Sequence, residues 1–330
     1  MCEKKYDIIG IGTPGLDMVV ELEKLPRDTV SRMMQDCCFQ GGGWVATALC
    51  AAGNLGMKTS FMGMIGNDIF GRMIEEDFKF NNVDTSHLII KDGIRSNLCL
   101  CLTESSTKSK TIISRPSECR EVDFCDLDEE YLKSTKMLHV GFVNDGIAHA
   151  ADIVRANGGK VSVDAAYYQP YIYNYYSHFD IFIGSEYFFN GLCKELGKES
   201  YENLSKEEIY EVMRYVSSQG PEIVIFTFGP DGCKGIYGDK TFEQPAMDVP
   251  VVDTTGAGDC FHGAFDTAYL MGKDVEESAR FATGVSSIKC TKLGGRAGIP
   301  DLEMLNKFLE NGEIDYEKLN KRAEHYKRGI

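Results

Sequence analysis

"VDTTGAGDCFHGAF" (residues 252–265) places three glycines and two carboxylates, those of Asp253 and Asp259, at a predicted junction between a strand and a helix. The small residues 256–258 let backbone N–H groups converge on one point without obstruction from side chains. A helix that begins there adds unpaired N–H donors and the positive end of its dipole, which together favour a bound anion such as a phosphoryl group. Asp259, in the first helical turn, would lie beside that anion and could accept the proton of an attacking hydroxyl.

A plainer interpretation of the same residues is a tight turn that starts a helix. An acidic residue in a first turn often only compensates the helix dipole, which is worth ~0.3–1 kcal/mol. The small residues Gly263, Ala264 and Ala268 lie among aromatic ones and predict that the helix packs closely against a neighbour. Local chemistry alone leaves both interpretations open.

Composition limits the classes of partner. The chain has 330 residues, 43% of them hydrophobic, and a formal net charge of −15. Such an acidic surface repels phosphate backbones and anionic headgroups, so we expect neither nucleic acid nor membrane partners. No apolar run approaches the ~18 residues that a bilayer span needs. The 12 cysteines show no zinc-site spacing, and neither they nor the N-terminus suggest secretion, so we expect reduced thiols in a cytoplasmic protein.

Apolar runs alternate with helix-period stretches through most of the chain. This alternation of strand and helix patterns predicts a largely parallel sheet with helices on both faces. Strands are predicted at residues 6–12, 60–66, 136–142, 160–165, 180–184 and 222–229. A helix over 67–81 would present Ile69, Phe70, Met73, Ile74 and Phe78 on one face. Another over 205–219 begins with a capping box formed by Ser205 and Glu208.

Two segments, 16–26 and 96–114, alternate instead between two faces, which predicts a small antiparallel sheet set apart from the main one. Both of its faces are fairly apolar, as in a lid over a ligand or a contact with a second subunit. We therefore expect a homodimer through this β-lid. The predicted units are an α/β core of residues 1–12, 41–92 and 123–330, and a β-lid of residues 13–40 and 93–122.

"GIGTPG" (10–15) has the glycine spacing of dinucleotide-binding folds, but the helix that this motif requires is not predicted to follow it. We interpret these glycines as a turn at a strand end that allows close approach of a ligand or the lid.

The longer pattern is more specific. "DTTGAGDCFHGAF" (253–265) resembles the C-terminal signature of the ribokinase-like (PfkB) carbohydrate kinase family almost residue for residue. "GGGWVATALCAAGNLG" (41–56) resembles the family's diglycine signature, "TFGPDGCKG" (227–235) its nucleotide turn, and "GGRAGIP" (294–300) the segment that closes the nucleotide pocket. The resemblance spans about residues 6 to 310. It implies a three-layer α/β/α core with a small β-sheet lid, and phosphorylation of a hydroxyl of a sugar or sugar-like molecule with ATP and Mg2+.

The resemblance also implies roles position by position. The catalytic positions are the base Asp259 and the amides of Gly256, Ala257 and Gly258. The substrate-binding positions are Asp17, Gly42, Gly43 and Thr47. The nucleotide-binding positions are Thr227, Gly229, Gly232, Ser185 and Glu186. Asp253 and Thr255 stand where many members of the family bind a monovalent cation such as K+.

Several residues depart from the family pattern. "SEYF" (185–188) replaces an Asn-x-x-Glu motif linked to the Mg-phosphate network and lacks its final glutamate. Trp44 and Thr47 replace a lysine and an asparagine of ribokinases, and Gly15 replaces another asparagine. The altered acceptor side argues against ribose itself. It leaves open a nucleoside kinase, and "SEYF" motivates a third alternative, a non-catalytic sugar- or nucleotide-binding protein.

Four further features are open to more than one interpretation. Trp44 could stack on a ligand or pack in the core. Asp164, at a predicted strand end, could contact substrate or a metal-bound water, or only cap the strand. His262 is expected to have a packing or surface role, and Cys260 to be inert. The tail, residues 316–330, shows little apolar periodicity and is expected to form a solvated helix.

Overall fold

The computed structural model describes residues 4–25, 31, 33–107 and 109–329. Parts of the predicted units, namely residues 1–3, 26–30, 32, 108 and 330, lie outside the described residues.

Within the described residues, a 10-stranded sheet forms the centre of the molecule, with the order β14-β13-β12-β11-β10-β9-β1-β4-β5 and β6 paired to β4. Strands β1, β4 and β9 to β12 are parallel, whereas β13 and β14 are antiparallel additions at one edge. The bounds are β1 Tyr6–Ile11, β4 Thr59–Gly66, β5 Val83–Asp84, β6 Leu88–Lys91, β9 Thr135–Val140, β10 Lys160–Ala165, β11 Ile181–Ser185, β12 Ile223–Thr227, β13 Cys233–Tyr237 and β14 Lys240–Gln244. The predicted strands and the mostly parallel sheet are confirmed.

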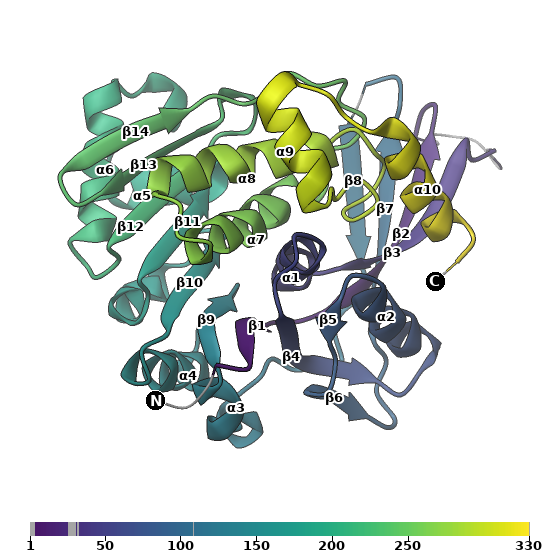
Figure 1. Ribbon diagram of the computed structural model, residues 1–330, viewed down its shortest axis with the longest axis horizontal. Coiled ribbons are helices and arrows are strands. Elements are labelled where there is room, and N and C mark those ends of the chain that lie inside the picture. Colours follow the sequence, from purple (N-terminus) through teal and green to yellow (C-terminus); the bar gives the residue numbers. More distant parts are fainter. Residues whose placement is uncertain (1–3, 26–30, 32, 108, 330) are drawn as a thin grey trace.

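Helices cover both faces of this sheet and make the predicted three layers (Figure 1). One buried cluster joins the sheet to α1 Trp44–Asn54, α2 Ile69–Phe80, α7 Ala257–Leu270, α8 Val275–Lys289 and α9 Leu302–Asn311. A second cluster, on the opposite face, joins it to α3 Glu129–Lys133, α4 Asp145–Ala156, α5 Glu186–Glu195 and α6 Lys206–Ser217. The two cores explain why most strands are apolar on both sides.

The predicted helix starts are confirmed, with one error in a predicted face. Ser205 and Glu208 form the expected capping box at α6. In α2, Ile74 and Phe78 are buried as expected, but Ile69 is 60% exposed. Ile69 and Phe78 are nine residues apart, which at 3.6 residues per turn places them on opposite sides of the helix.

The second sheet is separate from the first, as predicted, and lies to one side of the core (Figure 1). Its strands are β2 Gly15–Leu22, β3 Asp36–Gly42, β7 Asn97–Glu104 and β8 Ser109–Ser114, in the order β3-β2-β7-β8. The outer pairs are antiparallel, but β2 and β7 are parallel, so the expectation of a wholly antiparallel sheet is wrong. The chain leaves this sheet after β3, builds α1, β4 and α2 in the core, and re-enters it in the direction of β2.

The C-terminal helix α10, Tyr316–Lys327, corrects a second expectation. Its residues Leu319 and Tyr326 are buried, and Asn81 Nδ2 donates a hydrogen bond of 3.1 Å to Tyr326 Oη. The two buried residues are seven positions apart and therefore share one helical face. This helix packs beside β3 of the second sheet rather than standing free in solvent (Figure 1). Among the residues that the structure describes, no helix has the length and apolarity for crossing a bilayer.

Candidate active site

The glycine turn before α7 has the conformation that an anion site requires. Gly256 caps the helix with φ of 74°, in the left-handed region that favours glycine, and α7 begins at Ala257. A Cβ atom at Gly256 would lie 2.9 Å from the Cα of Gly295, so the two glycine segments are in close contact. The Ala257 N–H donates a hydrogen bond of 3.2 Å to the Thr254 carbonyl, whereas the N–H groups of Gly256 and Gly258 have no partner among the described residues and can donate to an anion.

Asp253 fixes the loop that leads into this turn. Its Oδ1 accepts hydrogen bonds from the N–H (2.9 Å) and the hydroxyl (2.8 Å) of Thr255, and its Oδ2 accepts one from the Gly294 N–H (2.8 Å). Its backbone carbonyl accepts a hydrogen bond of 2.8 Å from the ammonium group of the buried Lys289. Against the effect of burial, the charge of Lys289 and these hydrogen bonds hold the pKa of Asp253 below its ordinary value.

Asp259 and Asp17 face the same site from the core and from the second sheet. Burial and the charge of Asp17 raise the pKa of Asp259 to about 6, while Arg296 and Lys110 act in the opposite direction. Burial likewise raises the pKa of Asp17 to about 6, and Arg296 again opposes the shift. A carboxylate with such a pKa is ionised at neutral pH yet basic enough to take a proton, as a general base must. The structure therefore brings these two predicted site residues together.

The diglycine pair makes room for Asp17. A Cβ atom at Gly42 would lie 2.5 Å from both carboxylate oxygens of Asp17. Gly43 caps α1 with φ of 94°, and a Cβ atom there would lie 2.6 Å from the carbonyl oxygen of Thr13. Thr47, one turn into α1, is only 2% exposed and accepts a hydrogen bond of 3.3 Å from Arg296 Nε. Its hydroxyl is thus engaged by the protein itself.

Arg296 is the main residue that sequence reasoning missed on this side of the site. It is fully buried, forms an ion pair with Asp77, and donates a hydrogen bond of 3.1 Å to the carbonyl of Gly42. Gln40 Oε1 accepts from the N–H groups of Arg296 (2.7 Å) and Ala297 (3.0 Å), which ties the segment to β3. The only signal in the sequence was an arginine inside a glycine-rich stretch. Its positive charge offsets part of the burial cost of Asp17 and Asp259.

A cavity of about 280 Å³ opens beside Gly43. It is lined by Gly12, Thr13, Gly43, Trp44, Val45, Glu121, Gly141 and Phe142. Trp44 is 43% exposed, and its ring centroid lies 5.8 Å from that of Tyr167, so the core-packing interpretation is wrong. The "GIGTPG" segment contributes Gly12 and Thr13 to this cavity and leads into strand β2, so the absence of a dinucleotide-type helix is confirmed.

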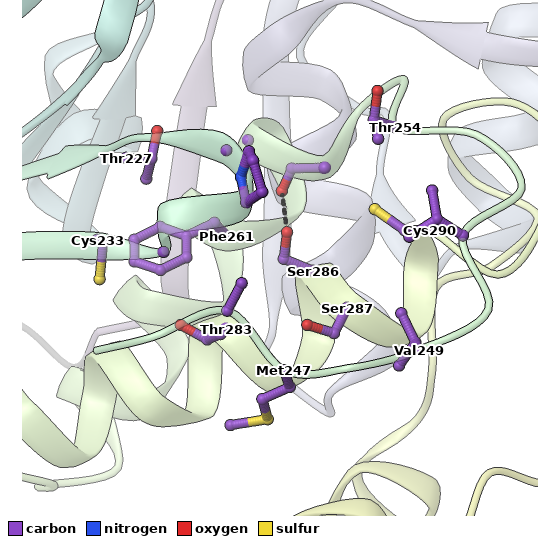
Figure 2. Close-up of a pocket in the computed structure, with 17 residues that line it drawn as sticks. Thr227, Cys233, Met247, Val249, Thr254, Phe261, Thr283, Ser286, Ser287 and Cys290 are labelled. Carbon is purple, nitrogen blue, oxygen red and sulfur yellow. Dashed lines mark hydrogen bonds between the residues drawn. The ribbon is translucent and has the colours of Figure 1, made fainter. Parts of the chain in front are cut away.

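A second cavity, of about 500 Å³, lies at the start of α7, between α8 and the turn after β12. Of the predicted nucleotide residues, Thr227, Gly229 and Gly232 line it, as do Ala257 and Gly258. The remaining lining residues were not predicted: Pro230, Cys233, Ala246, Met247, Val249, Val251, Thr254, Phe261, Thr283, Ser286, Ser287 and Cys290. The loop that bears Met247 and Val249 runs alongside α8, and Ser286 Oγ donates a hydrogen bond of 2.9 Å to the Ala257 carbonyl (Figure 2).

Ser185 and Glu186 lie next to this cavity rather than in its described lining. Ser185 pairs with Thr227 across β11 and β12, and its hydroxyl accepts a hydrogen bond of 3.2 Å from Phe188 N–H, capping α5. Burial and the charges of Glu202 and Asp231 raise the pKa of Glu186 above its ordinary value. Three acidic side chains therefore gather at this end of the cavity, which suits a hydrated Mg2+ bound to phosphates.

The start of α7 suits a bound anion and carries a carboxylate of raised pKa beside a large apolar cavity. This is the arrangement of a small-molecule kinase. Residues 9–302 match the model of the pfkB family of carbohydrate kinases, and the chain belongs to this family.

The curated relatives are full-length matches at low identity. A 5-dehydro-2-deoxygluconokinase of Halalkalibacterium halodurans is 25% identical, over 94% of this chain and 96% of its own. A nucleoside kinase of Methanothermobacter thermautotrophicus is 22% identical, over 89% and 93% of the two chains. A ribokinase of Haemophilus influenzae is 26% identical, over 91% and 97%.

Solved structures match in fold. Arabidopsis thaliana ribokinase, complexed with ribose and ATP, superposes with a TM-score of 0.76 at 23% identity, over 92% of this chain and 99% of its own. An Escherichia coli protein of the ribokinase II type, solved with ATP and Mg2+, gives 0.77 at 20% identity, over 92% and 99%. At these identities, the matches establish the ribokinase-like fold.

Proposed function

We propose that the protein transfers the γ-phosphoryl group of ATP to a primary hydroxyl of a sugar or sugar-like molecule. The observation that carries this proposal is the position of Asp259 in the first turn of α7, next to Ala257 and Gly258 that line the larger cavity, with the charge of Asp17 acting on it. The larger cavity, bordered by Thr227, Gly229 and Gly232, would hold the nucleotide, and the smaller one the acceptor.

Each predicted residue then has a chemical task. Asp259 takes the proton of the acceptor hydroxyl as that oxygen attacks phosphorus. We assign the amides of residues 256–258 to stabilising the charge on the transferred group. Those of Gly256 and Gly258 have no other partner among the described residues, and the Ala257 amide would exchange the Thr254 carbonyl for the phosphoryl oxygen. Asp17 accepts hydrogen bonds from other hydroxyls of the acceptor and so orients it. Lys110, on lid strand β8, is an exposed cation whose charge reaches Asp259, and we assign it to the phosphoryl group.

Mg2+ would enter with ATP. Glu186 and the neighbouring acidic residues Glu202 and Asp231 would hold it through its water shell. When bound, the ion supplies charge neutralisation between the β- and γ-phosphates. Glu186→Gln should therefore raise the Mg2+ concentration needed for half-maximal turnover more than the KM for the acceptor.

K+ does not fit the residues predicted for it. Both carboxylate oxygens and the carbonyl oxygen of Asp253 already accept hydrogen bonds, the last of them from the ammonium of Lys289. We propose that Lys289 supplies at this point the positive charge that other members take from a monovalent cation. Turnover should then be equal in K+ and in choline salts, whereas strong stimulation by K+ would contradict the assignment.

The decisive experiment measures ATP consumption, with Mg2+ present, against pentoses, hexoses, keto-acid sugars and nucleosides. Asp259→Asn should lower turnover ~10²–10⁴-fold, the usual contribution of a general base, while ATP binding persists. Asp239→Asn, an exposed carboxylate on the β13–β14 turn, is the matched control and should retain full activity. Equal turnover in Asp259→Asn and the parent would overturn the mechanism, and ATP binding without turnover on any acceptor would favour a non-catalytic binding protein.

A nucleoside is the second candidate acceptor. The exposed rings of Trp44 and Tyr167 stand together at the smaller cavity, and Phe142 lines it. Aromatic rings stack on a planar base as well as on a sugar face. Trp44→Leu should therefore raise the KM for a nucleoside more than the KM for a sugar if a base binds there.

We propose that residues 13–40 and 93–122 act as a lid on the core of 1–12, 41–92 and 123–330, in a cytoplasmic homodimer. The edge strand β8 supports a contact between two copies of the chain, because its apolar side chains Ile112 and Ile113 are 51% and 54% exposed. The cysteines that the structure describes are all unpaired, as in a reducing compartment. Light scattering should give twice the chain mass for the parent and the chain mass for Ile113→Lys.

A further inference from the structure

A buried cluster of histidines and carboxylates lies below the catalytic carboxylate and has no part in the proposed transfer. His139 is in β9, Asp164 is near the end of β10, and His262 is in α7. All three side chains are buried, and one donor atom of each lies within 4.8 Å of the others. Strands β9 and β10 are parallel neighbours, so their residues are presented side by side to the helix above.

The cluster is tied to the active site by the period of α7. His262 follows Asp259 by three residues, and residues so spaced lie on one side of a helix. Asp266, four residues further on, continues the same side of α7. It is buried, and its Oδ2 lies 2.7 Å from His139 Nδ1. On the side of α7 that carries Asp259, the buried polar residues His262 and Asp266 therefore follow toward the C-terminal end of the helix.

The separations suit a metal ion. Asp164 Oδ1 and His262 Nε2 are 3.4 Å apart, beyond a hydrogen bond of good geometry. A tetrahedral ion with bonds of ~2.0–2.1 Å keeps its ligand atoms about 3.4 Å apart, so these two atoms already stand at the required spacing. No pair of ligand atoms in the cluster needs to close by more than ~1.4 Å, which side-chain rotation can provide.

His139 is oriented as metal-binding histidines are. Its Nδ1 lies 2.7 Å from Asp266 Oδ2 and donates to it, because a carboxylate oxygen accepts, and this leaves Nε2 as the ring nitrogen available to an ion. That Nε2 atom is buried and has no hydrogen-bond partner among the described residues. The same is true of His262 Nδ1 and Asp266 Oδ1. A buried polar atom without a partner costs ~1–3 kcal/mol, so an ion bound to His139 Nε2 would remove that cost at this atom.

The charges of the two carboxylates also favour a metal ion in this cluster. Asp164 and Asp266 form ion pairs only with these histidines among the described residues, and no lysine or arginine contacts either carboxylate. Burial and the charges of Asp259 and Asp266 raise the pKa of Asp164, so its ionised form lacks a compensating positive charge, which a divalent cation would supply. Imidazole nitrogen with carboxylate oxygen is a donor set for Zn2+ and similar ions, whereas Mg2+ and Ca2+ prefer oxygen alone.

We propose that His139, Asp164 and His262 bind one divalent transition-metal ion, with Zn2+ as the best match, and that Asp266 orients His139 for this role. The ion ties β9, β10 and α7 together beneath the active site. It is distinct from the Mg2+ that accompanies ATP, and the proposal does not depend on the kinase activity.

The test uses metal-free full-length protein and Co2+ as the probe, with excess Mg2+ present to fill the phosphate-side sites. The parent should bind one Co2+ per chain and show the visible absorption of a tetrahedral ion without a thiolate charge-transfer band. Zn2+ should displace the Co2+ and raise the melting temperature. His139→Gln should lose the band, and His149→Gln, an exposed histidine on α4, should keep it.

Asp266→Asn keeps all three ligands and should weaken binding ~10–100-fold, as loss of an orienting carboxylate does elsewhere. This variant decides the matter if His139→Gln fails to fold. Absence of the band in the parent would mean that the cluster holds water and protons only, and would overturn the proposal. A band unchanged in Asp266→Asn, or one that shows thiolate character, would overturn it as well.

Discussion

Gly263 lies where α7, which carries Asp259, packs against α1, which begins after the diglycine pair. Substituting it by alanine should lower both the free energy of unfolding and kcat/KM. A Cβ atom at this position in α7 would lie 2.0 Å from the carbonyl oxygen of Ala48 in α1 and 2.6 Å from its carbonyl carbon. Ordinary contacts begin at 3.4 Å, so the two helices would have to separate by about 1.4 Å. The obstacle is backbone, which cannot rotate away as a side chain can.

The expected loss of stability can be worked from this contact. Overpacking a core usually costs ~1–3 kcal/mol, and a backbone obstacle places Gly263→Ala at the upper end. Alanine returns ~1 kcal/mol of helix propensity relative to glycine, so the free energy of unfolding should fall by ~2 kcal/mol. Because α7 carries Asp259 and α1 begins at the glycines that hold Asp17, a shift of this size should also lower kcat/KM ~10²-fold.

Gly258→Ala is the matched control for stability, because it changes the same residue type in the same helix with no atom within 4 Å of the new Cβ. It should leave stability unchanged or raise it by up to ~1 kcal/mol. With a urea m-value of ~3 kcal/mol/M, the two unfolding midpoints should differ by ~1 M. Equal midpoints for the two variants would refute the inference that α1 and α7 are in backbone contact at Gly263.

Three further predictions concern the carboxylates. The pKa of about 6 for Asp259 predicts that kcat/KM falls tenfold per pH unit below about pH 6. Lys110→Ala should move the midpoint of this profile to higher pH, because the charge of the lysine lowers the pKa of Asp259. A kcat/KM that does not change with pH in this range would contradict the assignment of Asp259 as the base. The folded pKa of Asp259 lies above its unfolded value of about 3.9, so the ionised form destabilises the fold above pH 6. Urea unfolding near pH 7 should accordingly show Asp259→Asn to be more stable than the parent by ~1–3 kcal/mol, a gain that disappears as pH falls from about 6 toward 4. Gly42→Ala should displace the Asp17 carboxylate and raise the KM for the acceptor, with the KM for ATP unchanged as its internal control.

The sequence alone determined the features that depend on residues close together in the chain. The glycines and Asp259 within residues 252–265 predicted the helix start at Ala257. Ser205 and Glu208 predicted the capping box of α6, since both partners lie within one turn. Continuous apolar runs against alternating ones separated the main sheet from the second sheet, because a strand buried on both faces needs apolar residues at every position. Even the missed burial of α10 was present in the spacing of Leu319 and Tyr326.

The tertiary structure alone decided what depends on distant residues. The ion pair of Arg296 with Asp77 joins positions 219 apart, and the contact of His139 with Asp266 joins positions 127 apart. The wall of the larger cavity from Thr283 to Cys290 has no motif of its own, and it becomes part of the site only because α8 packs beside α7. Local propensity cannot encode such pairs, because which faces meet is set by the packing of whole elements and not by the residues within one turn.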